Sequence, residues 1–256
     1  MPQAYSSAFS RAYQLRWGFF ARNCAPLIQA YYESTALGKT NHNLLDLCCG
    51  TGVLAKYFLD HGYQVSGLDL SPAMLVYARQ NTQDYLVAGQ VRYIQGDASN
   101  FHLQERFGLV VSTFDALNHL PDENALLGCF KSSHAVLEPE GTFIFDLNTP
   151  LGLRQWGGMS VDDSNPEALI INRGFIVEEE KRAWTCITGF LKEEDGRYTR
   201  FDEVAYNTIF QMARVEALLR QAGFAQVRFT RLNNLAAPLE DAEKESRVFI
   251  IAANIM

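Results

Sequence analysis

A glycine-containing turn carries the clearest chemical signal in the sequence. It spans residues 49–52 (Cys-Gly-Thr-Gly) and connects a short apolar run to a segment with helical spacing. Glycines at this point let the backbone approach a ligand closely, and the start of the helix offers unpaired N–H groups. Gly50, Gly52 and Ala55 also match a dinucleotide-binding fingerprint, in which Asp69 would bind the ribose. The turn therefore predicts a nucleotide-type cofactor and leaves its identity open.

Three carboxylates are predicted to lie beside this turn. Asp46 lies within the strand that precedes it, and Asp69 and Asp97 close the second and third predicted strands. The carboxyl ends of parallel strands form the ligand-binding edge of such sheets. A pyrophosphate gains nothing from the carboxylate of Asp46, whereas a positively charged ligand is favoured by it. Asp46 and Asp97 therefore favour a cationic cofactor over a dinucleotide, whereas Asp69 fits either cofactor.

A histidine follows the fourth predicted strand. We expect His119 at the rim of the same edge, where an imidazole with a pKa near neutrality could take a proton from an amine or a hydroxyl. The alternative is that His119 only bonds a backbone carbonyl or packs under a lid. The five histidines and five cysteines show no metal-ligand spacing, so we predict no metal site.

Aromatic residues repeat every four positions near the N-terminus, at Tyr5, Phe9, Tyr13 and Trp17. On a helix they would share one face, which could close over a cofactor and stabilise its positive charge. A stripe with this spacing is also typical of ordinary core packing. The sequence leaves both interpretations open.

Apolar runs alternate with helical segments through most of the chain, which predicts a doubly wound α/β domain with helices on both faces of a mostly parallel sheet of about seven strands. Ser71 is a predicted N-cap with Pro72 at the first helical position, and Gly62 is a predicted helix stop. The expected strands are 44–48, 65–68, 91–94, 109–111, 142–147, 225–230 and 247–255, and the main helices are 53–61, 122–137 and the segment closed by Gly223.

The stretch 149–209 is far longer than an ordinary connection. Residues 184–190 and 198–206 flank an Asp195-Gly196 turn, which predicts a hairpin. We expect a small antiparallel sheet over the C-terminal edge of the main sheet. The predicted organisation is one domain made of 1–148 and 210–256, with 149–209 inserted to cover a substrate pocket. The charged run 178–182 is expected to be a solvated strand edge.

Composition narrows the classes of function. The 256 residues carry 22 basic and 29 acidic side chains, a net charge of −7 that disfavours a nucleic-acid partner. Apolar runs are too short for a signal peptide or a membrane span, so we expect a cytoplasmic protein without a membrane partner. The cysteines include no C-x-x-C pair and are expected to be reduced thiols. The oligomeric state is left open.

On these residues the sequence resembles the class I S-adenosylmethionine-dependent methyltransferases, in the small-molecule branch that has an antiparallel sheet inserted after the fifth strand and includes sugar N-methyltransferases. Residues 46–52 match the family's glycine motif, 68–75 its second-strand motif, and 96–98 the segment that binds adenine; 143–150 resemble the fifth strand of this branch. The sequence departs from the pattern at Cys48 and Glu140, where glycine is commoner.

The resemblance implies S-adenosylmethionine as cofactor, S-adenosylhomocysteine as product, and methylation of a nitrogen or oxygen of a small-molecule acceptor. It places His119 at the position of the base proposed for sugar N-methyltransferases. A non-catalytic S-adenosylmethionine-binding module and an NAD(P)-dependent oxidoreductase are the alternatives, although the sequence lacks the Tyr-x-x-x-Lys pair of short-chain dehydrogenases. The expected cofactor-binding residues are Tyr13, Trp17, Asp46, Cys48, Gly50, Thr51, Gly52, Asp69, Leu70, Met74, Asp97, Ala98 and Thr113.

Overall fold

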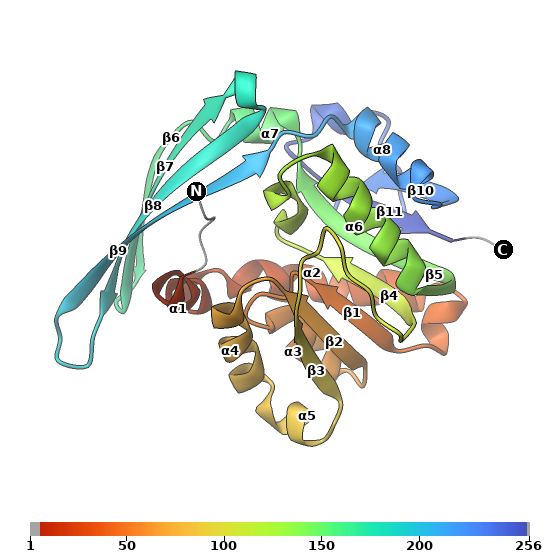
Figure 1. Ribbon diagram of the computed structural model, residues 1–256, viewed down its shortest axis with the longest axis horizontal. Coiled ribbons are helices and arrows are strands. Elements are labelled where there is room, and N and C mark those ends of the chain that lie inside the picture. The colour runs from red at the N-terminus through yellow and green to blue at the C-terminus, as the bar shows by residue number, and fades with distance from the viewer. Residues whose placement is uncertain (1–5, 255–256) are drawn as a thin grey trace.

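The computed structural model describes residues 6–254 and has a seven-stranded central sheet, with the strand order β10-β11-β5-β4-β1-β2-β3 (Figure 1). Strands β1 to β5 run parallel, and β11 is antiparallel to both β5 and β10. This confirms the predicted α/β class and the seven strands. The strands are β1 (Asn43–Leu47), β2 (Gln64–Asp69), β3 (Val91–Gln95), β4 (Phe107–Ser112), β5 (Leu137–Asn148), β10 (Gln226–Thr230) and β11 (Arg247–Ala253).

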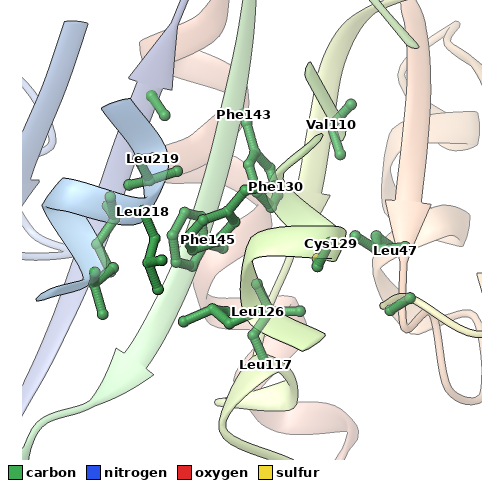
Figure 2. Close-up of a cluster of buried hydrophobic side chains, with 14 of the residues drawn as sticks. Leu47, Val110, Leu117, Leu126, Cys129, Phe130, Phe143, Phe145, Leu218 and Leu219 are labelled. Atoms are coloured by element: carbon green, nitrogen blue, oxygen red, sulfur yellow. The ribbon is translucent and has the colours of Figure 1, made fainter. Parts of the chain in front are cut away.

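Helices cover both faces of this sheet, because its central strands are apolar on both sides. On β5, Phe143 and Phe145 pack against one group of helices (Figure 2), and Ile144 faces the other group. The first group comprises α6 (Glu123–Val136) and α8 (Met212–Gln221); the second includes α2 (Gly18–Glu33), α3 (Val53–Asp60) and α4 (Pro72–Asn81), which is followed by the short α5 (Gln83–Val87).

Helix boundaries follow the predicted signals. The side chain of Ser71 accepts a hydrogen bond from the amide of Met74, with Pro72 opening α4. Gly62 has a φ of 84° just beyond the end of α3, which is the left-handed backbone that a helix stop requires. Both predictions are confirmed.

A second sheet of four antiparallel strands follows β5 and the short α7 (Pro150–Arg154); we call it sheet B. Two neighbouring strands of this sheet, β8 (Arg182–Lys192) and β9 (Tyr198–Thr208), form the predicted hairpin around Gly196. The strands β6 (Gly158–Asn165) and β7 (Ala168–Val177) extend it. Helix α1 (Ser7–Arg16) packs between sheet B and α4 (Figure 1).

Two expectations need correction. The charged run 178–182 is not a strand edge: Glu178–Glu180 form a 3₁₀ turn, and Lys181 at a φ of 53° reverses the chain between β7 and β8. Strand β5 begins at Leu137, five residues earlier than 142, because its first part pairs with β4 across a bulge at Phe107/Leu109. Tyr5, the first residue of the aromatic stripe, lies outside the described residues. Within residues 6–254, no helix is both long enough and apolar enough to cross a membrane.

Candidate active site

A cavity of about 590 Å³ lies between the C-terminal edge of the main sheet, α1 and sheet B. Most of the predicted site residues line it: Tyr13, Trp17, Cys48, Gly50, Asp69, Leu70, Met74, Asp97, Ala98, Thr113 and His119. Asp46, Thr51 and Gly52 are not on its wall. They lie within or behind the glycine turn, where Asp46 and Thr51 are buried.

The glycine turn is built from residues in the left-handed region. Cys48, Gly50 and Gly52 have φ values of 60°, 52° and 74°. The amide of Gly50 donates to Asp69 Oδ2 at 2.8 Å, and the amide of Ser71 donates to Asp69 Oδ1 at 2.8 Å. Asp69 thereby fixes the turn against the end of β2. The positive φ of Cys48 explains why glycine is commoner at this position.

Asp46 is a buried carboxylate at the end of β1. Only 2% of it is exposed, and within the described chain its Oδ2 atom has no hydrogen-bond partner. Burial raises the pKa of Asp46 to about 7, and the nearby charge of Asp69 acts in the same direction. A positive charge placed near Asp46 would therefore be stabilised.

Helix α1 brings its aromatic face to the cavity. The ring centroids of Tyr13 and Trp17 are 5.7 Å apart, and those of Phe9 and Trp17 are 5.6 Å apart. Gln14 exchanges two 3.0 Å hydrogen bonds with Asn81, whose amide also donates to the carbonyl of Thr51 at 2.8 Å. The helix is thus attached to the glycine turn through α4.

His119 ends a 3₁₀ turn, Ala116–His119, and lines the cavity. Its Nδ1 atom is 2.7 Å from the carbonyl oxygen of Tyr206 on β9. A carbonyl can only accept, so Nδ1 carries the proton and the lone pair of the neutral ring lies on Nε2. Burial lowers the pKa of His119, and the charge of Asp115 opposes this shift. The ring is therefore neutral at pH 7 and able to accept a proton.

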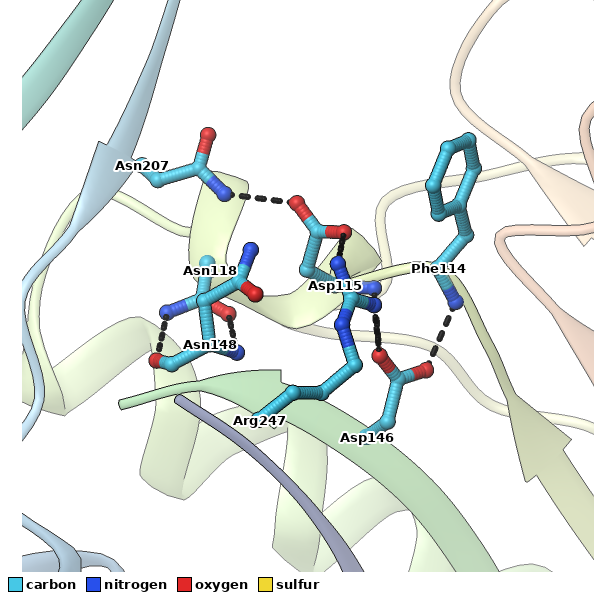
Figure 3. A network of polar contacts seen from close by, with 7 residues as sticks. All are labelled: Phe114, Asp115, Asn118, Asp146, Asn148, Asn207 and Arg247. Carbon is cyan, nitrogen blue, oxygen red and sulfur yellow. Dashed lines mark hydrogen bonds and ion pairs between the residues drawn. The ribbon is translucent and has the colours of Figure 1, made fainter. Parts of the chain in front are cut away.

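A polar network holds the loop that leads to His119, and Figure 3 shows its residues. The buried carboxylate of Asp146 accepts from the amides of Phe114 at 2.6 Å and Asp115 at 3.0 Å. Arg247 pairs with Asp146 and also with Asp115, the latter at 2.7 Å. Asn207 donates to the second oxygen of Asp115 at 2.8 Å. Burial raises the pKa of Asp146 to about 6, against the lowering effect of Arg247.

Sequence reasoning missed the roles of Asp115, Asn207 and Arg247. Asp115 lies within the segment that drew attention to His119, so its position was available but its partners were not. Arg247 is separated from Asp115 by more than half of the chain, and only the pairing of β11 with β5 brings the two together. No local pattern marks such a residue.

The inner face of sheet B closes the cavity with small uncharged residues. Alternation along the strands directs Ser160, Asn172, Thr185 and Ala205 toward it. In the part of the chain that the structure describes, no three histidine, cysteine or acidic side chains form a group that could hold a metal ion.

Comparison with known proteins gives the family. Residues 44–141 match the model of a family described as "Methyltransferase domain". The chain is 30% identical to demethylmenaquinone methyltransferase of Lactiplantibacillus plantarum, over 81% of each protein. It is 29% identical to dTDP-3-amino-3,4,6-trideoxy-alpha-D-glucopyranose N,N-dimethyltransferase of Streptomyces venezuelae, over 71% of this chain and 74% of the relative.

A solved structure shows the same fold. A S-adenosylmethionine-dependent methyltransferase from Clostridium acetobutylicum superposes with a TM-score of 0.81 at 21% identity, covering 97% of this chain and 98% of the other. This likeness shows the fold, and the relative from Lactiplantibacillus plantarum, at 30% sequence identity, shows the family. The chain belongs to the class I S-adenosylmethionine-dependent methyltransferases.

Proposed function

We propose that this methyltransferase methylates a nitrogen or oxygen of a small molecule held between the main sheet and sheet B. The observation that carries the proposal is the position of His119, which lines the same cavity as the glycine turn, Asp69 at the end of β2 and Asp97 just after β3. Residues 149–209, which contain sheet B, form the acceptor side of this arrangement. The Streptomyces relative is named for N,N-dimethylation of an amino sugar, which is chemistry of this kind.

The residues present fit S-adenosylmethionine. When bound, this cofactor supplies a methyl group that is already activated by attachment to a sulfonium. Asp46 has a buried oxygen that finds no partner among residues 6–254, and this carboxylate gains from a positive charge nearby. Asp69 binds the ribose hydroxyls and Asp97 the adenine amino group, as the family resemblance implies, while Leu70, Met74 and Ala98 flank the base. Cys48, Gly50, Tyr13, Trp17 and Thr113 line the cavity and would enclose the methionine side, while Thr51 and Gly52 would shape the glycine turn from behind.

The chain's own chemical task is to orient the acceptor, exclude water and accept a proton. His119 receives that proton at Nε2, because its Nδ1–H is engaged by the carbonyl of Tyr206. Helix α1 covers the reacting groups with Tyr13 and Trp17.

The charges of the cavity favour uncharged or cationic acceptors. Among the described residues, the charged side chains on its wall are Asp69, Asp97, Asp115 and Arg247. The guanidinium of Arg247 is already paired with two carboxylates. An amine acceptor therefore meets a favourable potential, whereas a phosphate-bearing one meets repulsion.

Calorimetric titration with S-adenosylmethionine, S-adenosylhomocysteine and NAD(H), in parallel, tests the cofactor assignment. We expect the two adenosyl compounds to bind and NAD(H) not to bind. Binding of NAD(H) alone would return the protein to the oxidoreductase alternative.

A screen of amines, sugars and small acids for release of S-adenosylhomocysteine then identifies an acceptor and tests the non-catalytic alternative. With that acceptor, His119→Ala should lower turnover about 100-fold and leave cofactor affinity nearly unchanged. His102→Ala, on an exposed loop, is the control. Equal turnover in His119→Ala and wild type would remove His119 from the mechanism.

A further inference from the structure

Asp115 is the residue at which three strands and a loop meet. Its carboxylate accepts from Arg247, at the start of β11, and from Asn207, near the end of β9. Its amide donates to Asp146 on β5. Only 6% of Asp115 is exposed. Any change in its side chain is therefore transmitted to the main sheet and to sheet B.

The backbone at Asp115 is held in a conformation that it would not adopt unaided. Phe114 and Asp115 have φ values of 66° and 49°, and two consecutive left-handed residues that are not glycine are costly. The two carboxylate oxygens of Asp146 accept hydrogen bonds from the backbone amides of these two residues, and Arg247 pairs with the carboxylates of Asp146 and Asp115. This network sets the direction in which the chain continues to His119.

The same loop forms hydrogen bonds to two consecutive residues of sheet B. His119 Nδ1 donates to the carbonyl of Tyr206, and Asp115 accepts from the side chain of Asn207, the next residue on β9. We propose that Asp115, held by Arg247 and Asn207, is a positioning residue that orients His119 and sets its charge for proton transfer. The inference rests on the proposed function, in which His119 accepts the proton.

Among the described residues, the charged groups linked to the His119 loop or to its partner Tyr206 come from four elements. Asp115 precedes the 3₁₀ turn, Asp146 lies on β5, and Arg247 lies on β11. Arg182 of β8 stands over the ring of Tyr206, with its guanidinium carbon 4.1 Å from the centroid. Replacing Asp115 by asparagine removes one negative charge and leaves Arg247 paired with Asp146. Protonated His119 then loses the attractive charge of Asp115.

The test is a pH titration of the protein with ¹⁵N-labelled histidines, followed by NMR without cofactor or acceptor. The His119 signal is assigned by its loss in His119→Asn. We expect the neutral wild-type ring to be protonated on Nδ1, and the midpoint of its titration to fall by about one pH unit in Asp115→Asn. Asp202→Asn makes the same substitution at an exposed site on β9, where Asp202 pairs with Arg200, and should leave the midpoint unchanged.

A folded Asp115→Asn protein with the wild-type midpoint would overturn the inference. If that variant does not fold, Asn207→Asp places an added carboxylate beside Asp115 and should raise the midpoint instead; an unchanged or lower midpoint would equally overturn it. The measurement reads the coupling of Asp115 to His119 directly. It is therefore independent of the turnover of His119→Ala, which tests the proposed base.

Discussion

Glu140 holds a backbone conformation that glycine adopts more easily. Its φ is 63°, at the point where β5 bends before its main run. Glu140→Gly should raise the free energy of unfolding by about 0.5–1 kcal/mol, because it relieves a left-handed residue that has a Cβ atom. Urea denaturation measures the difference. Glu138→Gly, two residues earlier in the same strand, should lower stability by a similar amount, and a loss of stability in Glu140→Gly would contradict this account.

Asp46 makes stability depend on pH. Its pKa in the folded protein is about 7, far above that of an unfolded aspartate, so the folded state binds the proton more tightly. Between about pH 4 and 7 stability must then fall as pH rises. Asp46→Asn removes this loss and should be more stable than wild type at pH 8 by roughly 2–4 kcal/mol, with the difference disappearing near pH 4.

Urea unfolding of wild type and Asp46→Asn at pH 5 and pH 8 checks this prediction. The buried Asp146, with a pKa of about 6, contributes a similar dependence to both proteins and cancels in the comparison. If the free energies of unfolding of the two proteins differ by the same amount at both pH values, Asp46 is ionised in the folded state throughout this range. The expected cost of Asp46→Asn is weaker binding of the cationic cofactor.

Individual site residues were predictable where a strand pattern pointed to them. Asp69 and Asp97 follow apolar runs, so their place at the carboxyl edge follows from the alternation of elements. Arg247 and Asn207 also begin or end strands, but an isolated arginine or asparagine carries no signal of its partner. The contacts of Arg247 depend on the antiparallel pairing of β11 with β5. The contact of Asn207 depends on the end of β9 lying against the loop that contains Asp115.

Helix α1 reconciles the two interpretations of the aromatic stripe. Phe9 and Ala12 are buried against Ile187 and Phe201 of sheet B, which is ordinary core packing. Tyr13 and Trp17, on the same face, border the cavity. Spacing alone could not separate these roles, because the partner of the first two residues is a sheet formed more than 150 positions later.

The attachment of α1 to sheet B should control access to the cofactor. The side chain of Arg16 is only 3% exposed and pairs with Asp162 of β6. Asp162→Asn leaves the buried guanidinium without its counter-charge, so α1 should detach more often. We expect amide hydrogen exchange in α1 and dissociation of S-adenosylmethionine, followed by tryptophan fluorescence, to become about tenfold faster.

Asp163→Asn is the matched control, because the neighbouring carboxylate lies on the opposite face of β6 and is exposed. If both variants release the cofactor at the wild-type rate, the ion pair does not limit opening of α1.

Sheet B was only half predictable. The Asp195-Gly196 turn indicated β8 and β9, whereas β6 begins at Gly158 and ends in the polar stretch 162–166, a composition typical of loops, and β7 follows that stretch. They become strands because β7 pairs with β8 along its whole length and β6 then pairs with β7. Such strands owe their structure to tertiary pairing rather than to local preference.

At the scale of the molecule, the alternation of apolar runs and helical segments was sufficient to predict the main sheet. Each crossover in a parallel sheet places a helix over apolar strands and buries them. The limits 149–209 of the inserted segment stay a prediction. How sheet B stands over the main sheet follows from contacts of residues distant in sequence, such as Asn118, which donates to the carbonyls of both Asn148 and Thr208. These contacts join the entry and exit of the insertion, and no local pattern reveals them.

The joined sheets enclose a cavity whose charge should select the acceptor. The amino sugar named for the Streptomyces relative, with and without its dTDP group, forms a matched pair that differs in negative charge. Because carboxylates outnumber arginines among the described residues of the cavity wall, we expect the free amino sugar to have a kcat/KM at least about tenfold above that of the dTDP-linked form. Release of S-adenosylhomocysteine measures both. Thr185→Lys adds a cation on the inner face of sheet B and should reduce or reverse this preference. If the wild-type enzyme instead prefers the dTDP-linked sugar, the phosphates bind outside the charged part of the cavity.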